Sequence, residues 1–157
     1  MEKIASFNVH HENLKRGVYV SRVDNVGSEV VTTFDIRMKE PNKFAMEADA
    51  IHTIEHLGAT YLRNDEDIKD KVLYFGPMGC QTGFYLIMKG EWVPKQIITY
   101  LTSMFCFMES AIEIPGLSPD ECGNFLLHDL VGAHIESEKF LHEVLLREDI
   151  PTEYPDE

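Results

Sequence analysis

The stretch His52-Thr-Ile-Glu-His56 holds three side chains that can bind a metal ion or move a proton. Successive residues of an α-helix are rotated by ~100°, so His56 would lie ~40° from His52, one turn along the same face. Both imidazoles could then reach one ion. Glu55 would lie ~60° to the other side of His52, where its carboxylate can accept a proton from a bound molecule. The spacing predicts a helical metal site with a base beside it; two unrelated histidines on an ordinary helix are the alternative.

Several residues could supply a third ligand. The candidates are Cys80, Cys122, His128, His134 and His142. Cys122 lies where we expect a helix to begin, and a helix N-terminus favours the thiolate that a metal requires. Two imidazoles and one thiolate suit Zn²⁺ or Fe²⁺ rather than Mg²⁺ or Ca²⁺, and three protein ligands leave one position open for catalysis. Spacing alone explains Cys122 equally well as a buried small thiol. We interpret His128 as a residue that supports the ligands rather than as a ligand.

A second thiol lies in a loop bracketed by glycines, Met78-Gly-Cys-Gln-Thr-Gly83. Loops between strands present side chains to clefts, and a reactive cysteine needs partial exposure and a nearby cation or metal. Cys80 is therefore a candidate acid or base, with an inert loop thiol as the alternative. Cys106 lies in an apolar helical stripe and is interpreted as a packing residue without a chemical role.

The elements that must position these side chains follow from the apolar periodicity. We expect strands at 18–23, 29–38, 74–75 and 83–88, and helices at 47–63, 94–110 and 118–147. Ser118 and Glu121 have the spacing of a capping box at the start of the last helix, with a break near Gly132. In the second strand, Asp35 and Arg37 fall on a polar face, where alternation alone predicts solvated charges.

Strands and helices are mixed along the chain without regular βαβ alternation. This predicts an α+β fold with a small antiparallel sheet and helices packed against one side. Residues 1–157 are expected to form a single domain, in which about 148–157 are a loose acidic tail.

Composition restricts the partners. The chain has 27 acidic and 14 basic residues and a net charge of −13, so nucleic acids and anionic membranes are disfavoured. The N-terminus lacks the apolar stretch of a signal peptide, and the apolar runs are too short to span a bilayer. Three cysteines, an odd number, argue against a disulfide framework. We expect a cytoplasmic protein that binds neither nucleic acid nor a membrane.

These segments together resemble one family, the S-ribosylhomocysteine lyases of bacterial autoinducer-2 synthesis. The resemblance runs from Ser6 to about Gly132. Its parts are Ser6-Phe7 with His11, Phe34-Asp-Ile-Arg37 with Pro41-Asn42, His52-Thr-Ile-Glu-His56, Gly76-Pro-Met-Gly-Cys-Gln-Thr-Gly83, Cys122-Gly123 and Leu127-His-Asp-Leu130. The chain has His10 where members often have Asp, and Tyr74 where some have an acid. Both departures concern substrate contacts.

The resemblance implies roles for particular residues. The implied metal ligands are His52, His56 and Cys122. The implied acid/base pair is Glu55 and Cys80. The residues implied to surround the substrate or Cys80 are Ser6, His11 and Arg37. The resemblance also implies one Fe²⁺ per subunit, replaceable by Zn²⁺ or Co²⁺, and a homodimer with active sites at its interface. The implied roles are autoinducer synthesis for quorum sensing and homocysteine recycling in the activated methyl cycle.

The family reaction splits S-ribosylhomocysteine into homocysteine and 4,5-dihydroxy-2,3-pentanedione. The sugar carbonyl begins at C1 while sulfur is on C5, so no group activates the carbon–sulfur bond. Two carbonyl shifts bring the carbonyl to C3, the C4 proton becomes acidic, and the thiolate leaves by β-elimination. This chemistry needs a Lewis-acid metal and two proton-transfer groups. We expect Cys80 to serve the early shifts, Glu55 the later ones, and Arg37 to favour the Cys80 thiolate.

Two other interpretations share the histidine motif. H-x-x-E-H is also the signature of reversed zincins, which are metallopeptidases. They usually take a downstream Glu or His as third ligand, whereas the best third ligand here is a thiolate and Cys80 would have no role in peptide hydrolysis. A structural metal-binding domain is the second alternative, and it would close the site with a fourth protein ligand.

Overall fold

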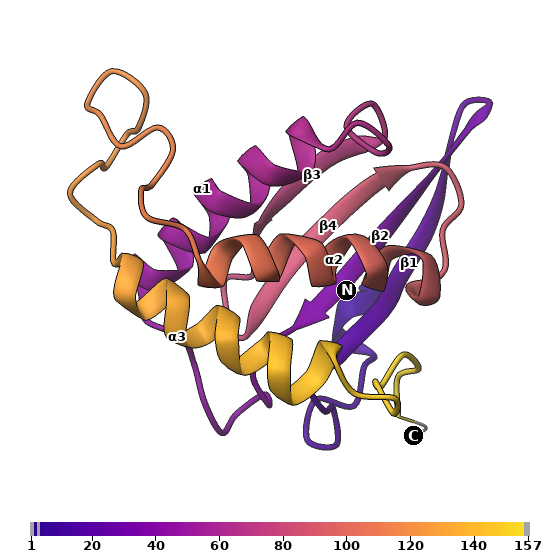
Figure 1. The fold of residues 1–157 in the computed structure, drawn as a ribbon. Coiled ribbons are helices and arrows are strands. Elements are labelled where there is room, and N and C mark those ends of the chain that lie inside the picture. Colours follow the sequence, from indigo (N-terminus) through magenta and orange to yellow (C-terminus); the bar gives the residue numbers. More distant parts are fainter. Residues whose placement is uncertain (1, 3, 156–157) are drawn as a thin grey trace.

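Helices cover one face of a four-stranded antiparallel sheet in the computed structural model, which describes residues 2 and 4–155 (Figure 1). The strand order is β1-β2-β4-β3, with bounds β1 (Gly17–Val26), β2 (Glu29–Arg37), β3 (Val72–Pro77) and β4 (Gly83–Lys89). The α-helices within the described residues are α1 (Ala48–Asn64), α2 (Pro94–Glu109) and α3 (Leu130–Phe140). The 3₁₀ turn η1 (Ala5–Phe7) precedes the sheet, and the π-helical turn η2 (Leu141–Leu145) continues α3. The predicted α+β fold is confirmed.

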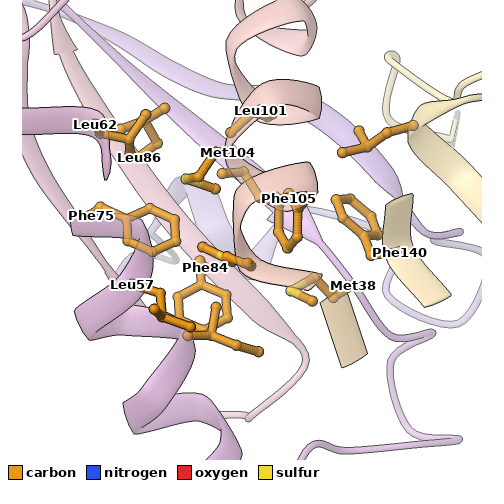
Figure 2. Packing of buried hydrophobic residues seen from close by; sticks show 14 of the residues in the cluster. Met38, Leu57, Leu62, Phe75, Phe84, Leu86, Leu101, Met104, Phe105 and Phe140 are labelled. Atoms are coloured by element: carbon orange, nitrogen blue, oxygen red, sulfur yellow. The ribbon is translucent and has the colours of Figure 1, made fainter. Parts of the chain in front are cut away.

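The core lies between the sheet and the helices. Alternation along β2 and β4 sends every second side chain toward the helices, and those of Phe34, Ile36, Phe84 and Leu86 are fully buried. Aromatic rings from different elements meet there, as Figure 2 shows. The ring centroids of Phe75 and Phe84 are 5.0 Å apart in a stacked pair. This packing fixes the helices on the sheet.

Helix α1 is held especially close to its neighbours. A Cβ atom at Gly58 would overlap the ring of Phe75 on β3 and would lie 2.9 Å from the Cε atom of Met108 on α2. Only glycine allows this approach. Because α1 carries His52, Glu55 and His56, the close contact also fixes the position of the candidate metal ligands.

The region 118–129 differs from the prediction, because it forms a loop rather than the start of a helix. Ser118 caps no helix: its hydroxyl donates to the Glu121 carboxylate at 2.7 Å. Helix α3 begins at Leu130, and its N-cap is Asp129, whose side chain accepts from the N–H of Gly132 at 2.9 Å. The predicted break near Gly132 is therefore also wrong. The apolar residues of the loop cover no core, and Leu126 is 81% exposed. A helix there would bury no apolar face, which is the main source of helix stability in proteins.

The polar face of β2 is buried, whereas the sequence predicted that its charges are solvated. Asp35 and Arg37 point away from the helices, yet they are only 2% and 3% exposed, so the expected solvated arginine is wrong. They pair with each other, and Asp35 also accepts a hydrogen bond from the Tyr154 hydroxyl. Within the segment expected to be loose, the Pro151 carbonyl accepts a backbone hydrogen bond from β1 and Tyr154 stacks on Tyr19. Residues 156 and 157 lie outside the described residues.

Within residues 2 and 4–155, the helices are too short or too polar to cross a bilayer.

Candidate metal centre and thiol site

The two histidines of α1 present the same ring nitrogen to one point. Nδ1 of His52 lies 2.7 Å from the carbonyl oxygen of Leu127, and Nδ1 of His56 lies 2.7 Å from that of Pro115. A carbonyl oxygen can only accept, so each Nδ1 carries the proton and each Nε2 keeps a free lone pair. Hydrogen bonds of this kind fix the tautomer and the orientation of metal-binding imidazoles. Both partner carbonyls belong to the connection between α2 and α3, coloured orange in Figure 1.

The same connection brings a thiol and a third imidazole to the histidines. Sγ of Cys122 lies 3.5 Å from Nε2 of His52 and 3.8 Å from Nε2 of His128. The ligand atoms of His52, His56, Cys122 and His128 all lie within 4.8 Å of one another. Donors that share one tetrahedral ion at 2.0–2.3 Å are on the order of 3.5 Å apart. This group could therefore hold a metal ion.

The orientation of His128 is set by the buried hydroxyl of Thr53. That hydroxyl donates to the Asp49 carbonyl oxygen at 2.9 Å and accepts from the Asp129 N–H at 2.9 Å. Its one hydrogen is used, so the 3.1 Å contact with Nδ1 of His128 must be donated by the imidazole. Nε2 of His128 then keeps its lone pair and faces the cluster.

His128 is also held in the neutral form that a ligand requires. Its ring stacks on that of His52 with the centroids 3.9 Å apart. Burial, followed by the nearby imidazoles of His52 and His56, lowers the pKa of His128 from its usual 6.5 to about 4. Sequence reasoning placed His128 only in a supporting role, whereas the structure puts its Nε2 within reach of the same ion. A site with three ligands and one open position stays a prediction.

The donor set fits a transition metal. Three imidazole nitrogens and a thiolate suit Zn²⁺ or Fe²⁺, while Mg²⁺ and Ca²⁺ prefer oxygen. Glu55 directly precedes His56 on α1 and is half-buried. Among residues 2 and 4–155, its carboxylate has no hydrogen-bond or salt-bridge partner, so it is free to exchange a proton with a bound molecule.

The second candidate group lies where β2 ends and β4 begins. Nη1 of Arg37 donates to the Thr82 hydroxyl at 2.7 Å and lies 3.9 Å from Sγ of Cys80. Sγ of Cys80 is in turn 3.0 Å from the Thr82 hydroxyl. These three residues and His11 line a cavity of about 460 Å³, within the size range of small-molecule sites. Cys80 is exposed, as its glycine-bracketed loop predicted.

One glycine makes this arrangement possible. A Cβ atom at Gly83 would overlap the carbonyl oxygen of Ile36, so glycine lets β4 start directly against the end of β2. Gly83 pairs with Arg37 in the sheet. The loop that carries Cys80 is thereby placed beside the Arg37 guanidinium.

The predicted site residues do not all lie in one site of the structure. Ser6 lines a separate cavity of about 270 Å³ together with Tyr74 and Tyr85. Across the described part of the chain, no hydrogen bond or salt bridge joins the Cys80 group to the metal-binding group. In a single chain, the predicted site residues therefore form two separate groups, one around the metal-binding histidines and one around Cys80.

Two of the candidate third ligands, His134 and His142, contact other groups. Nε2 of His134 contacts the Ala111 carbonyl oxygen at 2.7 Å, and Nε2 of His142 pairs with the Glu109 carboxylate at 3.0 Å. Neither belongs to the metal-binding group. Cys106 is exposed, so the expectation that it packs in an apolar stripe is wrong.

Sequence reasoning missed three supporting residues: Thr53, Thr82 and Asp35. Asp35 and Thr82 each lie two residues from a predicted site residue, Arg37 and Cys80. Thr53 directly follows His52, but nothing in the local sequence pairs it with His128, which lies 75 residues away along the chain.

Comparison with known proteins gives one consistent result. The model of the S-Ribosylhomocysteinase (LuxS) family matches residues 4–150. An S-ribosylhomocysteine lyase of Porphyromonas gingivalis is 53% identical over 162 residues, which cover 99% of this chain and 100% of the relative. That of Desulfotalea psychrophila is 54% identical over 147 residues, covering 92% of each chain. That of Clostridium beijerinckii is 52% identical over 148 residues, covering 93% of each.

Proposed function

The chain belongs to the S-ribosylhomocysteinase (LuxS) family, and from this premise we infer that it is a carbon–sulfur lyase. It cleaves S-ribosylhomocysteine, giving homocysteine and 4,5-dihydroxy-2,3-pentanedione. The observation that carries this conclusion is the match to lyases of that name over nearly the whole chain. The same chain brings a metal-binding group and an arginine-paired thiol onto one scaffold.

The proposed cofactor is one Fe²⁺ per subunit, replaceable by Zn²⁺ or Co²⁺. His52, His56 and Cys122 would hold it, with His128 beside them as a fourth donor. When bound, such an ion supplies Lewis acidity that polarises a sugar carbonyl and makes the neighbouring C–H acidic. Three imidazoles and a thiolate support this proposal because their soft and borderline donors match these ions.

The proposed proton transfers use Cys80 first. As a thiolate it removes the C2 proton, and the return of a proton to C1 moves the carbonyl from C1 to C2. Removal of the C3 proton and its return to C2 then moves the carbonyl to C3. Arg37 supports the thiolate because its Nη1 lies 3.9 Å from Sγ, and Thr82 can donate its hydroxyl hydrogen to the same sulfur.

The proposed elimination uses Glu55. Its carboxylate removes the C4 proton once the carbonyl is at C3, the electron pair forms a C4–C5 double bond, and the C5–S bond breaks. Sulfur leaves with its electrons as the homocysteine thiolate, and the enol product tautomerises to the dione. Within residues 2 and 4–155 the half-buried carboxylate of Glu55 has no hydrogen-bond partner, which supports this role because general bases need a lone pair free for the proton.

We further propose a homodimer with its active sites at the interface. Ser6 and His11 would contact the substrate there, with Ser6 supplied by one of the two subunits. The separation of Ser6 from the Cys80 cavity supports this assembly, because one chain alone does not join these residues. The exposed free thiols Cys80 and Cys106 suit a reducing compartment such as the cytoplasm. There the product would serve autoinducer synthesis.

Thiol release tests the function directly. Anaerobically purified protein is incubated with S-ribosylhomocysteine, free thiol is titrated against a sample without substrate, and metal is measured in the same preparation. Cys80→Ala should abolish turnover and keep the metal, while the matched control Cys106→Ala should keep both. No thiol release from the metal-loaded wild type would refute the proposed function. Loss of metal from Cys80→Ala would show instead that Cys80 is a ligand.

A further inference from the structure

Residues 151–154 form a strap over the face of the sheet that the helices leave open. The Pro151 carbonyl accepts a hydrogen bond from the N–H of Val18 at 3.0 Å, which ties the strap to edge strand β1. A Cβ atom at Gly17 would overlap that same carbonyl oxygen, so glycine allows the contact. Three residues later, the ring of Tyr154 stacks on Tyr19 with the centroids 4.8 Å apart and the planes 9° apart. Tyr154 lies beyond the residues matched by the family model, which end at 150.

The strap reaches a buried carboxylate. The hydroxyl of Tyr154 donates to Oδ2 of Asp35 at 2.9 Å. Burial, and then the charge of Asp35, raises the pKa of Tyr154, so the phenol keeps its hydrogen and acts as a donor. Asp35 also accepts from Arg37, through Nε to Oδ1 at 3.1 Å and through Nη2 to Oδ2 at 2.6 Å. Three hydrogen bonds thus fix the plane of one carboxylate that is 2% exposed.

The carboxylate in turn aims the guanidinium. With Nε and Nη2 engaged on Asp35, the remaining nitrogen of Arg37 is Nη1, which faces the Thr82 hydroxyl at 2.7 Å and Sγ of Cys80 at 3.9 Å. Burial alone would lower the pKa of Arg37, but the Asp35 charge and hydrogen bonds raise it, so Arg37 stays charged. Because Thr82 accepts from Arg37, its hydrogen is free to point at Sγ, 3.0 Å away.

We propose that Tyr154 is a positioning residue for Cys80. Its hydroxyl holds the Asp35 carboxylate in the plane that directs Arg37 toward the thiol, and the stack on Tyr19 and the Pro151 hydrogen bond hold the hydroxyl in place. The inference deepens the proposed function, because it rests on Cys80 acting as the acid/base group. Tyr154 touches neither the sulfur nor the cavity, so its effect must pass through Asp35 and Arg37.

Other groups also face Cys80, and the test must leave them unchanged. Burial, followed by the charge of Asp35, raises the pKa of Tyr85 on β4, and the charge of Cys80 contributes to the same rise. His11 and Lys43 line the same cavity as Cys80. None of them forms a hydrogen bond with Tyr154 within the described residues. A change confined to the Tyr154 hydroxyl therefore acts on the thiol through the Asp35–Arg37 pair.

Tyr154→Phe removes the hydroxyl and keeps the ring that stacks on Tyr19. The matched control is Tyr100→Phe on α2, whose hydroxyl makes no hydrogen bond among the described residues. For Tyr154→Phe, kcat for thiol release should fall about threefold to tenfold, because one hydrogen bond is lost while the two from Arg37 remain. KM and metal content should stay within twofold of wild type. The pH profile of Cys80 alkylation, followed on its own peptide by mass spectrometry, should move upward by about half a pH unit or more.

A second variant ends the chain after Thr152, which keeps the Pro151 contact and deletes Tyr154. It should move the alkylation profile at least as far as Tyr154→Phe does. If either variant lowers only the melting temperature and leaves kcat and the alkylation profile at wild-type values, Tyr154 is merely a structural clamp and the proposal is overturned. Wild-type protein that releases no thiol would refute the proposed function instead, while alkylation of Cys80 would still report on Tyr154.

Discussion

Replacing Thr53 with Val tests the connection between α1 and the loop that carries Cys122 and His128. The Thr53 side chain is fully buried, and its oxygen accepts from the Asp129 N–H and from Nδ1 of His128. Val has nearly the same shape, so the substitution removes the hydroxyl without opening a large cavity. The imidazole would lose the partner that fixes its tautomer, and Nε2 of His128 would no longer be forced toward the cluster.

The size of the effect follows from the two donors left without an acceptor. A buried donor without a partner costs about 1–3 kcal/mol. Because His128 is only half-buried and can regain a water, we expect a combined loss of about 2–3 kcal/mol of unfolding free energy. For a chain of this length, that corresponds to a fall of roughly 4–12 °C in the melting temperature. Metal affinity should fall about 10-fold to 100-fold, as it does when a group that orients a ligand is removed.

Two measurements check these values. Thermal unfolding is followed on metal-free protein, and metal affinity is measured by competition with a chromophoric chelator. Thr60→Val on the same helix is the control, because its side chain makes no hydrogen bond in the described part of the chain. Thr53→Ser, which keeps the hydroxyl, should behave nearly as wild type. If Thr53→Val matches Thr60→Val in both measurements, Thr53 does not orient His128 and the reasoning fails.

Two further predictions concern the metal and the core. Cys122→Ala should weaken metal binding more than 10-fold in the chelator assay, whereas Cys106→Ala, which removes an exposed thiol, should not change it; equal affinities would exclude Cys122 as a ligand. Gly58→Ala should lower the unfolding free energy by about 1–2 kcal/mol in urea titrations, because overlap with the Phe75 ring outweighs the gain in helix propensity. Gly79→Ala meets open space and should stay within about 0.5 kcal/mol; a stable Gly58→Ala protein would mean that the ring moves aside freely.

The sequence alone determined the parts of this protein that depend on local periodicity. The helical period predicted that His52, Glu55 and His56 share one region of a helix, and α1 begins within one residue of the expected start. Strict alternation in 29–38 identified both faces of β2, because side chains of a strand alternate whatever the rest of the chain does. The glycine-bracketed loop likewise predicted an exposed Cys80.

Only the tertiary structure decided how distant segments complete these local patterns. The pattern of β2 assigned Arg37 to the polar face, but its buried partner Asp35 also accepts a hydrogen bond from Tyr154, which lies 119 residues beyond Asp35. Capping residues before Cys122 predicted a helix, whereas the loop there is held by carbonyl contacts to His52 and His56. Periodicity reports only the face on which a side chain lies. What covers that face is set by packing and hydrogen bonds between segments far apart in the chain, which leave no regular trace in the local sequence.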